Sequence, residues 1–108
     1  MTRAEWITWH DNKAVRRGEG VFQERPCTEI FSAENGMIQY VVDGETMVIY
    51  EIMGCFSYWE EWILWICRTI GVKKVVCYYE VDDPRTLERL YKTKAVREKD
   101  CWRFEREV

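Results

Sequence analysis

Alternating apolar and polar positions between residues 29 and 53 predict three consecutive β-strands. The runs are Glu29–Ala33, Met37–Val42 and Glu45–Met53, and they are separated by Asn35-Gly36 and Asp43-Gly44. Asn-Gly and Asp-Gly supply the positive φ angles that tight hairpin turns require. The pattern therefore predicts an antiparallel meander of three strands.

The third of these runs is apolar on both faces, which is typical of a central strand covered on both sides. Strict alternation places four residues on one face: Met47, Ile49, Glu51 and Met53. Glu51 is then a carboxylate on an apolar strand. If it faces a cleft, burial raises its pKa toward the range of a general base. The alternative is a glutamate at an edge or paired with a cation.

A helical period follows the meander. Ser57 and Glu60 match a capping box, and the helix they open runs to Ile70 with Gly71 as its C-cap. The apolar stripe consists of Trp59, Trp62, Ile63, Ile66, Cys67 and Ile70. We expect Trp59 and Trp62 to be core residues.

The C-terminal third predicts a strand, a helix and a hairpin. Lys73–Val81 is a nearly continuous apolar run, typical of a buried strand. Asp83 is expected to be the N-cap of the next helix and Pro84 its first residue. The runs Ala95–Arg97 and Cys101–Glu107 are expected to pair as the final hairpin.

The N-terminal segment permits two arrangements. We favour a short strand at Glu5–Thr8, with Thr8 capping a helix from Trp9 to Arg17. A rival capping box, Thr2 with Glu5, would start the helix earlier and remove the strand. Residues 18–26 follow as a predicted loop.

This order of elements resembles the GNAT superfamily of acyl-CoA N-acyltransferases, especially its small members in phage and prophage genomes. The resemblance implies a mixed α/β (α+β) fold with one domain over residues 1–108. The segment Leu90–Val96 is similar to the family's Tyr-x-x-x-Gly-Phe segment, with Ala95 and Val96 in place of Gly and Phe. The resemblance puts Tyr91 at the family's general acid, near the sulfur of the cofactor. Glu51 lies on the strand where family members often carry a glutamate.

The resemblance also implies where acetyl-CoA would lie, between the strands at residues 45–53 and 73–81, where the family splays its sheet. The family binds the pyrophosphate through an Arg/Gln-x-x-Gly-x-Gly/Ala loop that precedes a helix N-terminus, where backbone amides and the helix dipole favour anions. The residues here are Gly54, Cys55, Phe56 and Ser57. They include no basic residue, and Glu60 and Glu61 follow in the first turn. The sequence therefore favours no cofactor, with acetyl-CoA as the alternative.

Composition limits the remaining chemistry. A hydrophobic content of 47% provides ample material for a core. The five cysteines lack metal-site spacing and indicate reduced thiols in a cytoplasmic protein, and we expect no metal site. We expect no signal peptide, because the first residues lack an apolar segment, and no apolar run reaches the ~18 residues needed to span a membrane. Cys55, before a helix N-terminus, could form a thiolate, but a buried structural role is favoured. His10 is expected to be a surface residue.

Charge is uneven along the chain, whose formal net charge is −3. Residues 19–61 are acidic, whereas residues 85–97 carry five basic residues: Arg85, Arg89, Lys92, Lys94 and Arg97. An acidic chain of this kind is a poor candidate for nucleic-acid binding. Large apolar residues outside the helical stripes and nearby acids are the candidate interface residues: Trp65, Leu64, Glu60, Glu61, Trp6 and Trp9. For the aromatics among them, packing in the core or in a dimer is the favoured alternative.

Two functions follow from these features. The favoured one is a non-catalytic GNAT-like module that binds another protein, a basic one or a second copy of itself. The phage resemblance would make it a host-interaction or inhibitor protein in the host cytoplasm. The alternative is a divergent acetyl-CoA-dependent N-acetyltransferase in which Tyr91 is the general acid and Glu51 the base.

Overall fold

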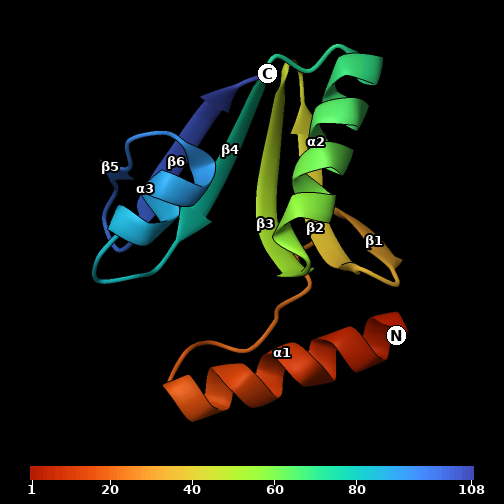
Figure 1. Ribbon diagram of the computed structural model, residues 1–108, viewed down its shortest axis with the longest axis vertical. Coiled ribbons are helices and arrows are strands. Elements are labelled where there is room, and N and C mark those ends of the chain that lie inside the picture. Colours follow the sequence, from red (N-terminus) through yellow and green to blue (C-terminus); the bar gives the residue numbers. More distant parts are fainter.

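The structure is a computed structural model that describes all 108 residues. One six-stranded mixed sheet has the order β1-β2-β3-β4-β6-β5, and three helices pack on it (Figure 1). The strands are β1 Glu29–Ala33, β2 Gly36–Asp43, β3 Thr46–Gly54, β4 Lys74–Tyr79, β5 Val96–Arg97 and β6 Trp102–Glu107. The helices are α1 Arg3–Arg17, α2 Phe56–Ile70 and α3 Arg85–Tyr91. The mixed α/β architecture, the three-strand meander and the final strand pair are confirmed.

Helix α1 begins at Arg3, earlier than the start at Trp9 that we favoured from the sequence. The predicted strand at Glu5–Thr8 is wrong, because the rival capping box forms instead. The backbone amide of Thr2 donates to Glu5 Oε1 at 2.9 Å, and the backbone amide of Glu5 donates to Thr2 Oγ1 at 3.2 Å. The longer helix also buries Trp6, which is 8% exposed and donates from Nε1 to the Ala33 carbonyl at 2.9 Å. Tertiary burial of this indole therefore decides between the two caps.

Close packing in the meander depends on one glycine. Gly36 begins β2 with φ +147°, and its Cα lies against β3 and α2. A Cβ at this position would lie 1.9 Å from the Met53 carbonyl oxygen and 2.5 Å from Trp59 Nε1. Trp59 itself is fully buried and donates from Nε1 to the Met53 carbonyl at 3.0 Å. The turn glycine therefore serves packing between the sheet and α2 as well as chain reversal.

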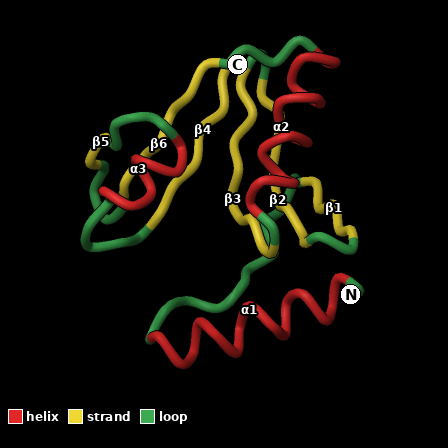
Figure 2. The backbone as a smooth tube through the Cα atoms, viewed as in Figure 1, coloured by secondary structure: helices red, strands yellow, loops and turns green.

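Strands β3 and β4 run parallel but pair over four residues only, ending at Ile49 and Cys77. Beyond that pair, β3 continues to Gly54 and β4 to Tyr79 with no pairing between them. The two strands diverge toward the lower part of Figures 1 and 2. We call this point of divergence, after Ile49 and Cys77, the fork. The splayed sheet implied by the family resemblance is present.

A β-bulge in β3 lies directly at the fork. Gln39 pairs with Glu51, whereas the next residue of β2, Tyr40, pairs with Ile49. Tyr50 is therefore the extra residue. A bulge bends its strand and increases the local twist. The bend begins one residue after the last β3–β4 pair, so the bulge gives a physical reason for the divergence of the two strands.

Each face of the sheet carries its own apolar cluster. On one face α2 and α3 pack on the sheet and form with it a cluster of ten buried residues: Ile38, Met47, Ile49, Trp59, Ile63, Cys67, Val72, Cys77, Tyr91 and Phe104. A smaller cluster of Trp6, Met37 and Met53 joins α1 to β2 and β3. Adjacent residues Met37 and Ile38 belong to different clusters, so α1 lies on the face opposite α2. Figure 1 shows α1 crossing below the end of β3.

The helix starts differ from the predicted caps. The N-cap of α2 is Cys55 rather than Ser57, and the predicted Ser57–Glu60 box is wrong because Glu60 contacts Arg106 Nη1 at 3.4 Å. The N-cap of α3 is Pro84 rather than Asp83. The Asp83 side chain still accepts from the backbone amide of Arg85 at 3.0 Å. Gly71 ends α2 with φ +80°, as predicted.

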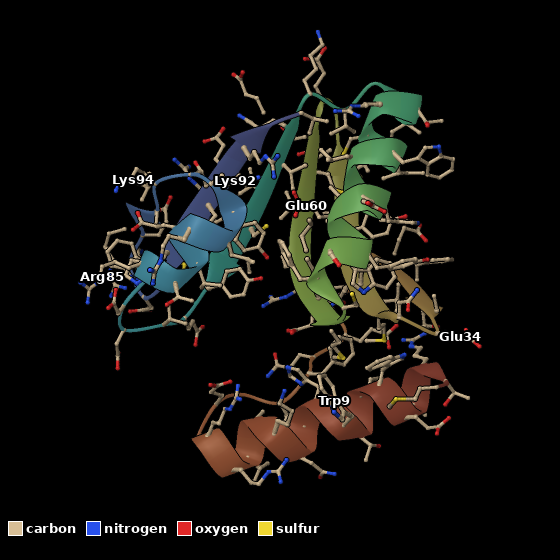
Figure 3. The ribbon with its side chains drawn as sticks, viewed as in Figure 1. Trp9, Glu34, Glu60, Arg85, Lys92 and Lys94 are labelled. Carbon is tan, nitrogen blue, oxygen red and sulfur yellow. The ribbon has the colours of Figure 1, made fainter.

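The tryptophans divide between core and surface. Trp59 is core as predicted, and Trp62 is half-buried and stacked on Phe31 at 5.6 Å between ring centroids. Trp6 is buried, in agreement with the favoured packing role and not with its candidacy as an exposed anchor, whereas Trp65 is 61% exposed and Trp9 is also exposed. Figure 3 shows Trp9 on the helix below the sheet.

Candidate functional site

Glu51 lies on the α1 face of the sheet, one residue beyond the bulge at Tyr50. Strict alternation would place it with Ile49 under α2, and that expectation is wrong. The extra residue shifts the side-chain alternation by one, so that Ile49 packs in the α2 cluster and Met53 in the α1 cluster. The bulge therefore turns the carboxylate of Glu51 toward α1.

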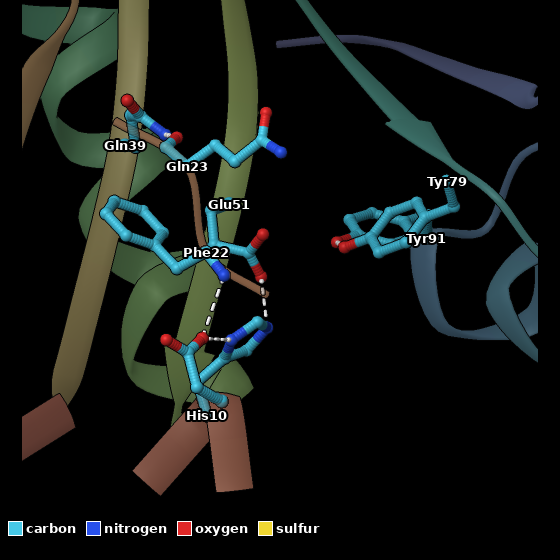
Figure 4. A network of polar contacts seen from close by, with 8 residues as sticks. His10, Phe22, Gln23, Gln39, Glu51, Tyr79 and Tyr91 are labelled. Carbon is cyan, nitrogen blue, oxygen red and sulfur yellow. Dashed lines mark hydrogen bonds and ion pairs between the residues drawn. The ribbon is translucent and has the colours of Figure 1, made fainter. Parts of the chain in front are cut away.

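Helix α1 supplies the partners of Glu51 (Figure 4). His10 Nε2 lies 3.3 Å from Glu51 Oε1. The other ring nitrogen, His10 Nδ1, lies 3.0 Å from Asp11 Oδ1. The same Asp11 oxygen accepts the backbone amide of Phe22 at 2.8 Å. A carboxylate–imidazole–carboxylate chain thus leads from the sheet to α1, and the expectation that His10 is a plain surface residue is wrong.

Burial is the largest influence on the pKa of Glu51 and raises it. The charge of His10 lowers this pKa, whereas Asp11 and Glu19 raise it and Arg25 lowers it. The Glu51 side chain remains 30% exposed. A carboxylate with a raised pKa, within reach of solvent, has the properties that a general base needs.

Tyr79 and Tyr91 form a hydrogen-bonded hydroxyl pair on the other side of the fork. Burial raises the pKa of both hydroxyls, and Cys77, whose pKa burial raises to about 12, lies beside them. In Figure 4 the two hydroxyls point toward the side where Glu51 lies. The negative charge of Glu51 also contributes to the raised pKa of Tyr79. Glu51 and Tyr91, which the sequence singled out, therefore lie on opposite sides of the fork.

A small apolar cavity of about 40 Å³ lies on the α2 and α3 face of the fork. Ile49 and Cys77, the last paired residues of β3 and β4, contribute to its lining, together with Tyr91 and Phe56. Phe56 packs edge-on against Tyr91, with 5.2 Å between the ring centroids. Leu64 also lines this cavity. It is half-buried, so it is only partly exposed for the interface for which the sequence made it a candidate.

The Gly54–Ser57 junction connects the diverging part of β3 to α2. Gly54 has φ +92°, and the backbone amide of Cys55 donates to the Asn35 carbonyl at 2.8 Å. Cys55 is exposed, so the favoured buried role for it is wrong. The Ser57 hydroxyl, 3.3 Å from Cys55 Sγ, is the largest cause of its lowered pKa, followed by the backbone amide of Tyr58. Cys55 is the N-cap of α2, and its side chain makes no capping hydrogen bond.

One buried polar residue went unnoticed in the sequence. Gln39 is almost fully buried, and its Oε1 accepts from the backbone amide of Arg25 at 2.7 Å and from the Thr28 hydroxyl at 3.0 Å. Its Nε2 donates to the Gln23 carbonyl at 3.1 Å. Gln39 thereby holds the segment between α1 and β1 against the sheet, next to Glu51. A polar residue in the middle of an apolar strand is the only sequence signal for this role.

The remaining candidate residues lie on the outer surface. Glu61 and Trp65 border a shallow depression on the solvent side of α2 with Leu64, Arg68 and Thr69. Arg85, Lys92 and Lys94 surround α3, far from Trp9 (Figure 3). No group of three or more His, Cys, Asp or Glu side chains is arranged to hold a metal ion, and none of the helices is long and apolar enough to cross a membrane.

Solved acetyltransferase structures share this fold. An IAA acetyltransferase from Bacillus cereus aligns with a TM-score of 0.55 and 12% identity over 99% of this chain and 93% of that one. An acetyltransferase from Bacillus subtilis in complex with CoA aligns with a TM-score of 0.55 and 10% identity, over 100% of this chain and 94% of that one. The PaiA N-acetyltransferase from Thermoplasma acidophilum in complex with coenzyme A aligns with a TM-score of 0.53 and 11% identity, over 68% of this chain and 53% of that one.

No family model matches the chain, and no curated protein sequence matches it. The fold is therefore GNAT-like, as the element order predicted. At this low sequence identity, the similarity establishes the fold alone.

Proposed function

We propose that this chain is a divergent acyl-CoA-dependent N-acyltransferase in which the reaction takes place at the fork. The observation that supports this most strongly is the pair of groups there. A carboxylate with a raised pKa, Glu51, lies on one side, and the buried hydroxyl of Tyr91 lies on the other. These groups are what acyl transfer from a thioester to an amine requires, a base and an acid.

The residues at the fork fit the acyl-CoA arm. Beyond Ile49 and Cys77 the facing edges of β3 and β4 are unpaired, and their amides and carbonyls are open to an extended polar chain. The apolar cavity beside Tyr91 suits the carbon chain and sulfur at the end of such an arm. Helix α2 begins next to this edge, and its N-cap Cys55 makes no capping hydrogen bond. The first-turn amides, two of which lie near the exposed Cys55 sulfur, are the donors offered to the phosphates.

The acidic residues after the junction interfere less with this fit than the sequence suggested. Glu60 contacts Arg106 of β6 at 3.4 Å, so its charge is partly balanced within the fold. Glu61 is exposed and borders the depression on the outer side of α2. The absence of a basic residue from Gly54–Ser57 leaves backbone amides as the phosphate donors, which favours weak binding of the cofactor.

Bound acyl-CoA supplies the activated acyl group as a thioester. Glu51 accepts a proton from the acceptor amine, and the amine nitrogen forms a bond to the acyl carbon. The carbon–sulfur bond breaks, and Tyr91 donates its proton to the departing sulfur. Burial keeps Tyr91 protonated before the reaction, because it raises the pKa of the hydroxyl. Tyr79 holds the Tyr91 hydroxyl in place through their hydrogen bond.

The sequence alone favoured a protein-binding module without catalysis. The solved structures that share the fold are acetyltransferases, two of them in complex with CoA, and they support the alternative better. Exposed Trp65 is the remaining observation in favour of a protein interface. It lies on the outer side of α2, so it is compatible with a catalytic fork.

The test is an acyl-transfer assay on the purified chain. Acetyl-CoA is incubated with a panel of primary amines, such as spermidine, a lysine peptide and an aromatic amine, and the release of CoA thiol is measured. We expect release that depends on one class of amine and falls by about 10²–10⁴-fold in Glu51→Gln. Release at the background rate with every amine would remove the proposal and leave the protein-binding module.

A further inference from the structure

The hydrogen-bond partners of Asp11 determine which nitrogen of His10 carries a proton. Asp11 Oδ1 accepts the backbone amide of Phe22 at 2.8 Å, and this bond is the main reason that the pKa of Asp11 is lowered. An ionised carboxylate has acceptors only. The 3.0 Å contact between Asp11 Oδ1 and His10 Nδ1 is therefore a hydrogen bond in which Nδ1 donates.

With Nδ1 as the donor, the contact between His10 Nε2 and Glu51 Oε1 at 3.3 Å must contain a proton. If it did not, a lone pair on the ring would face a charged oxygen. The proton belongs either to Glu51, which then donates to Nε2, or to the imidazole, which then donates to Glu51. Glu51 and His10 thus share one proton.

The chain from Glu51 to Asp11 is open to solvent at both ends, because the side chains of Glu51 and Asp11 are each 30% exposed and that of His10 between them is 21% exposed. Glu51 lies on β3 at the fork, whereas Asp11 lies within α1 and accepts from Phe22 of the segment that follows the helix. The other charges that face Glu51 are Glu19 and Arg25, both from that segment. Across the fork the uncharged Tyr79 is the titratable neighbour.

We propose that His10 is a positioning residue that holds the carboxylate of Glu51 toward the fork and carries away the proton that Glu51 removes from the acceptor amine. This inference rests on the proposed acyltransferase function. In the state that accepts a proton, the shared proton lies on His10 Nε2, so Glu51 is ionised and both ring nitrogens carry a proton. Glu51 takes a proton from the amine, and the ring releases its Nδ1 proton to solvent beside Asp11. The starting state returns when the ring regains a proton on Nδ1 and Glu51 releases its own, so that one proton leaves to solvent in each cycle. No net charge accumulates at the fork.

A purely structural role for His10 would be to attach α1 to the sheet. The two roles differ in what they change. A structural tether affects stability and leaves the ionisation of Glu51 to burial alone, whereas a relay couples the titration of Glu51 to the imidazole. Trp6 already attaches α1 through its buried indole, so loss of the imidazole should leave the helix in place.

The variants are His10→Gln, Asp11→Asn and, as a matched control on the exposed side of α1, Asn12→Ala. Glutamine keeps a polar side chain but cannot carry the proton. Asparagine keeps an oxygen that can accept from Phe22. The measurements are the carbon-13 NMR titration of the Glu51 carboxyl and the pH profile of acetyl-CoA-dependent acylation, with the best amine of the panel.

We expect His10→Gln to move the Glu51 titration to higher pH, because the charge of His10 lowers that pKa in the wild type. The turnover should fall by about 10- to 100-fold at neutral pH, with little change in KM for acetyl-CoA, and recover as pH rises. Added imidazole should restore part of the rate in His10→Ala. Asn12→Ala should match the wild type in both measurements.

The inference is overturned if the wild type transfers acyl groups and His10→Gln keeps the wild-type pH profile and Glu51 titration. That outcome leaves the proposed function intact. If the wild type transfers no acyl group to any amine, the proposed function fails and the relay fails with it, whatever the NMR titration shows. Should His10→Gln fold poorly, Asp11→Asn tests the same coupling, and an unchanged pH profile there also overturns the inference.

Discussion

Replacing Tyr91 by phenylalanine removes one hydroxyl from a buried hydrogen-bonded pair and leaves the other without its partner. Tyr91 is buried, and its hydroxyl bonds to that of Tyr79 beside Cys77. Loss of one partner of a buried pair costs about 1–3 kcal/mol. For a domain of this size each kcal/mol corresponds to about 4 °C in Tm. We therefore expect Tyr91→Phe to melt about 4–12 °C below the wild type.

The double variant Tyr79→Phe with Tyr91→Phe separates stability from catalysis. Replacing both partners of a pair by apolar groups of the same shape is close to neutral, so most of the lost stability should return. Activity should not return, because the proton donor is gone, and a missing acid lowers the rate by about 10²–10⁴-fold. Tyr79→Phe alone is the matched control, since it loses stability but keeps the Tyr91 hydroxyl.

Thermal denaturation and thiol release, measured on the wild type and the three variants, test this reasoning. The expected pattern has the lowest activity in both proteins that lack the Tyr91 hydroxyl and a smaller loss in Tyr79→Phe, which keeps the proton donor but not the bond that holds it. A double variant that regains activity together with stability would show that Tyr91 acts only through packing. Equal melting of the single and double variants would show that the hydroxyl pair is not a coupled unit.

Three further results are expected. Gly36→Ala should lower the free energy of unfolding, measured by urea denaturation, by about 1–3 kcal/mol or more, because its Cβ would lie 1.9 Å from a backbone oxygen at φ +147°. Gly44 has φ +60° and open space around it, so Gly44→Ala should lower the same free energy by about 1 kcal/mol. Since the pKa of Glu51 is raised above 4.5 on folding, the folded state binds its proton more tightly, and its contribution to stability declines as pH rises from 4.5 through the folded value. Glu51→Gln should remove this decline, and urea midpoints at several pH values that stay parallel for both proteins would contradict it. Iodoacetamide, followed by mass spectrometry, should label exposed Cys55 well before buried Cys77, and equal labelling rates would contradict the lowered pKa of Cys55.

Local signals in the sequence predicted most of the sheet. Asn35-Gly36 and Asp43-Gly44 mark the two hairpins, and the apolar run before Asp83 marks β4. The start of α1 was wrong because two capping sequences, at Thr2 and Thr8, compete locally. The burial of Trp6 against β1 decides between them, and that contact is invisible in sequence order.

The candidate site was predicted only in part. Glu51 and Tyr91 were found, but the face of Glu51 was wrong, because the apolar alternation of β3 continues through the bulge at Tyr50 without any break. The role of His10 was missed, since it lies 41 residues before Glu51 and meets it only through the docking of α1. Bulges and helix docking are tertiary features, so residue patterns alone do not reveal them.

The central claim is that the fork binds acyl-CoA, and a calorimetric titration with CoA and acetyl-CoA, supported by thermal denaturation, tests it most directly. We expect saturable binding of one ligand per chain, with stabilisation of about 2.7 kcal/mol at 100 times the Kd and a Tm that rises by several degrees. Binding should weaken when bulky tryptophan replaces Cys77 at the fork, while exposed Trp65→Ala should bind as the wild type does. No heat and no rise in Tm at millimolar CoA would contradict the account and leave a GNAT-like protein without the cofactor of its fold.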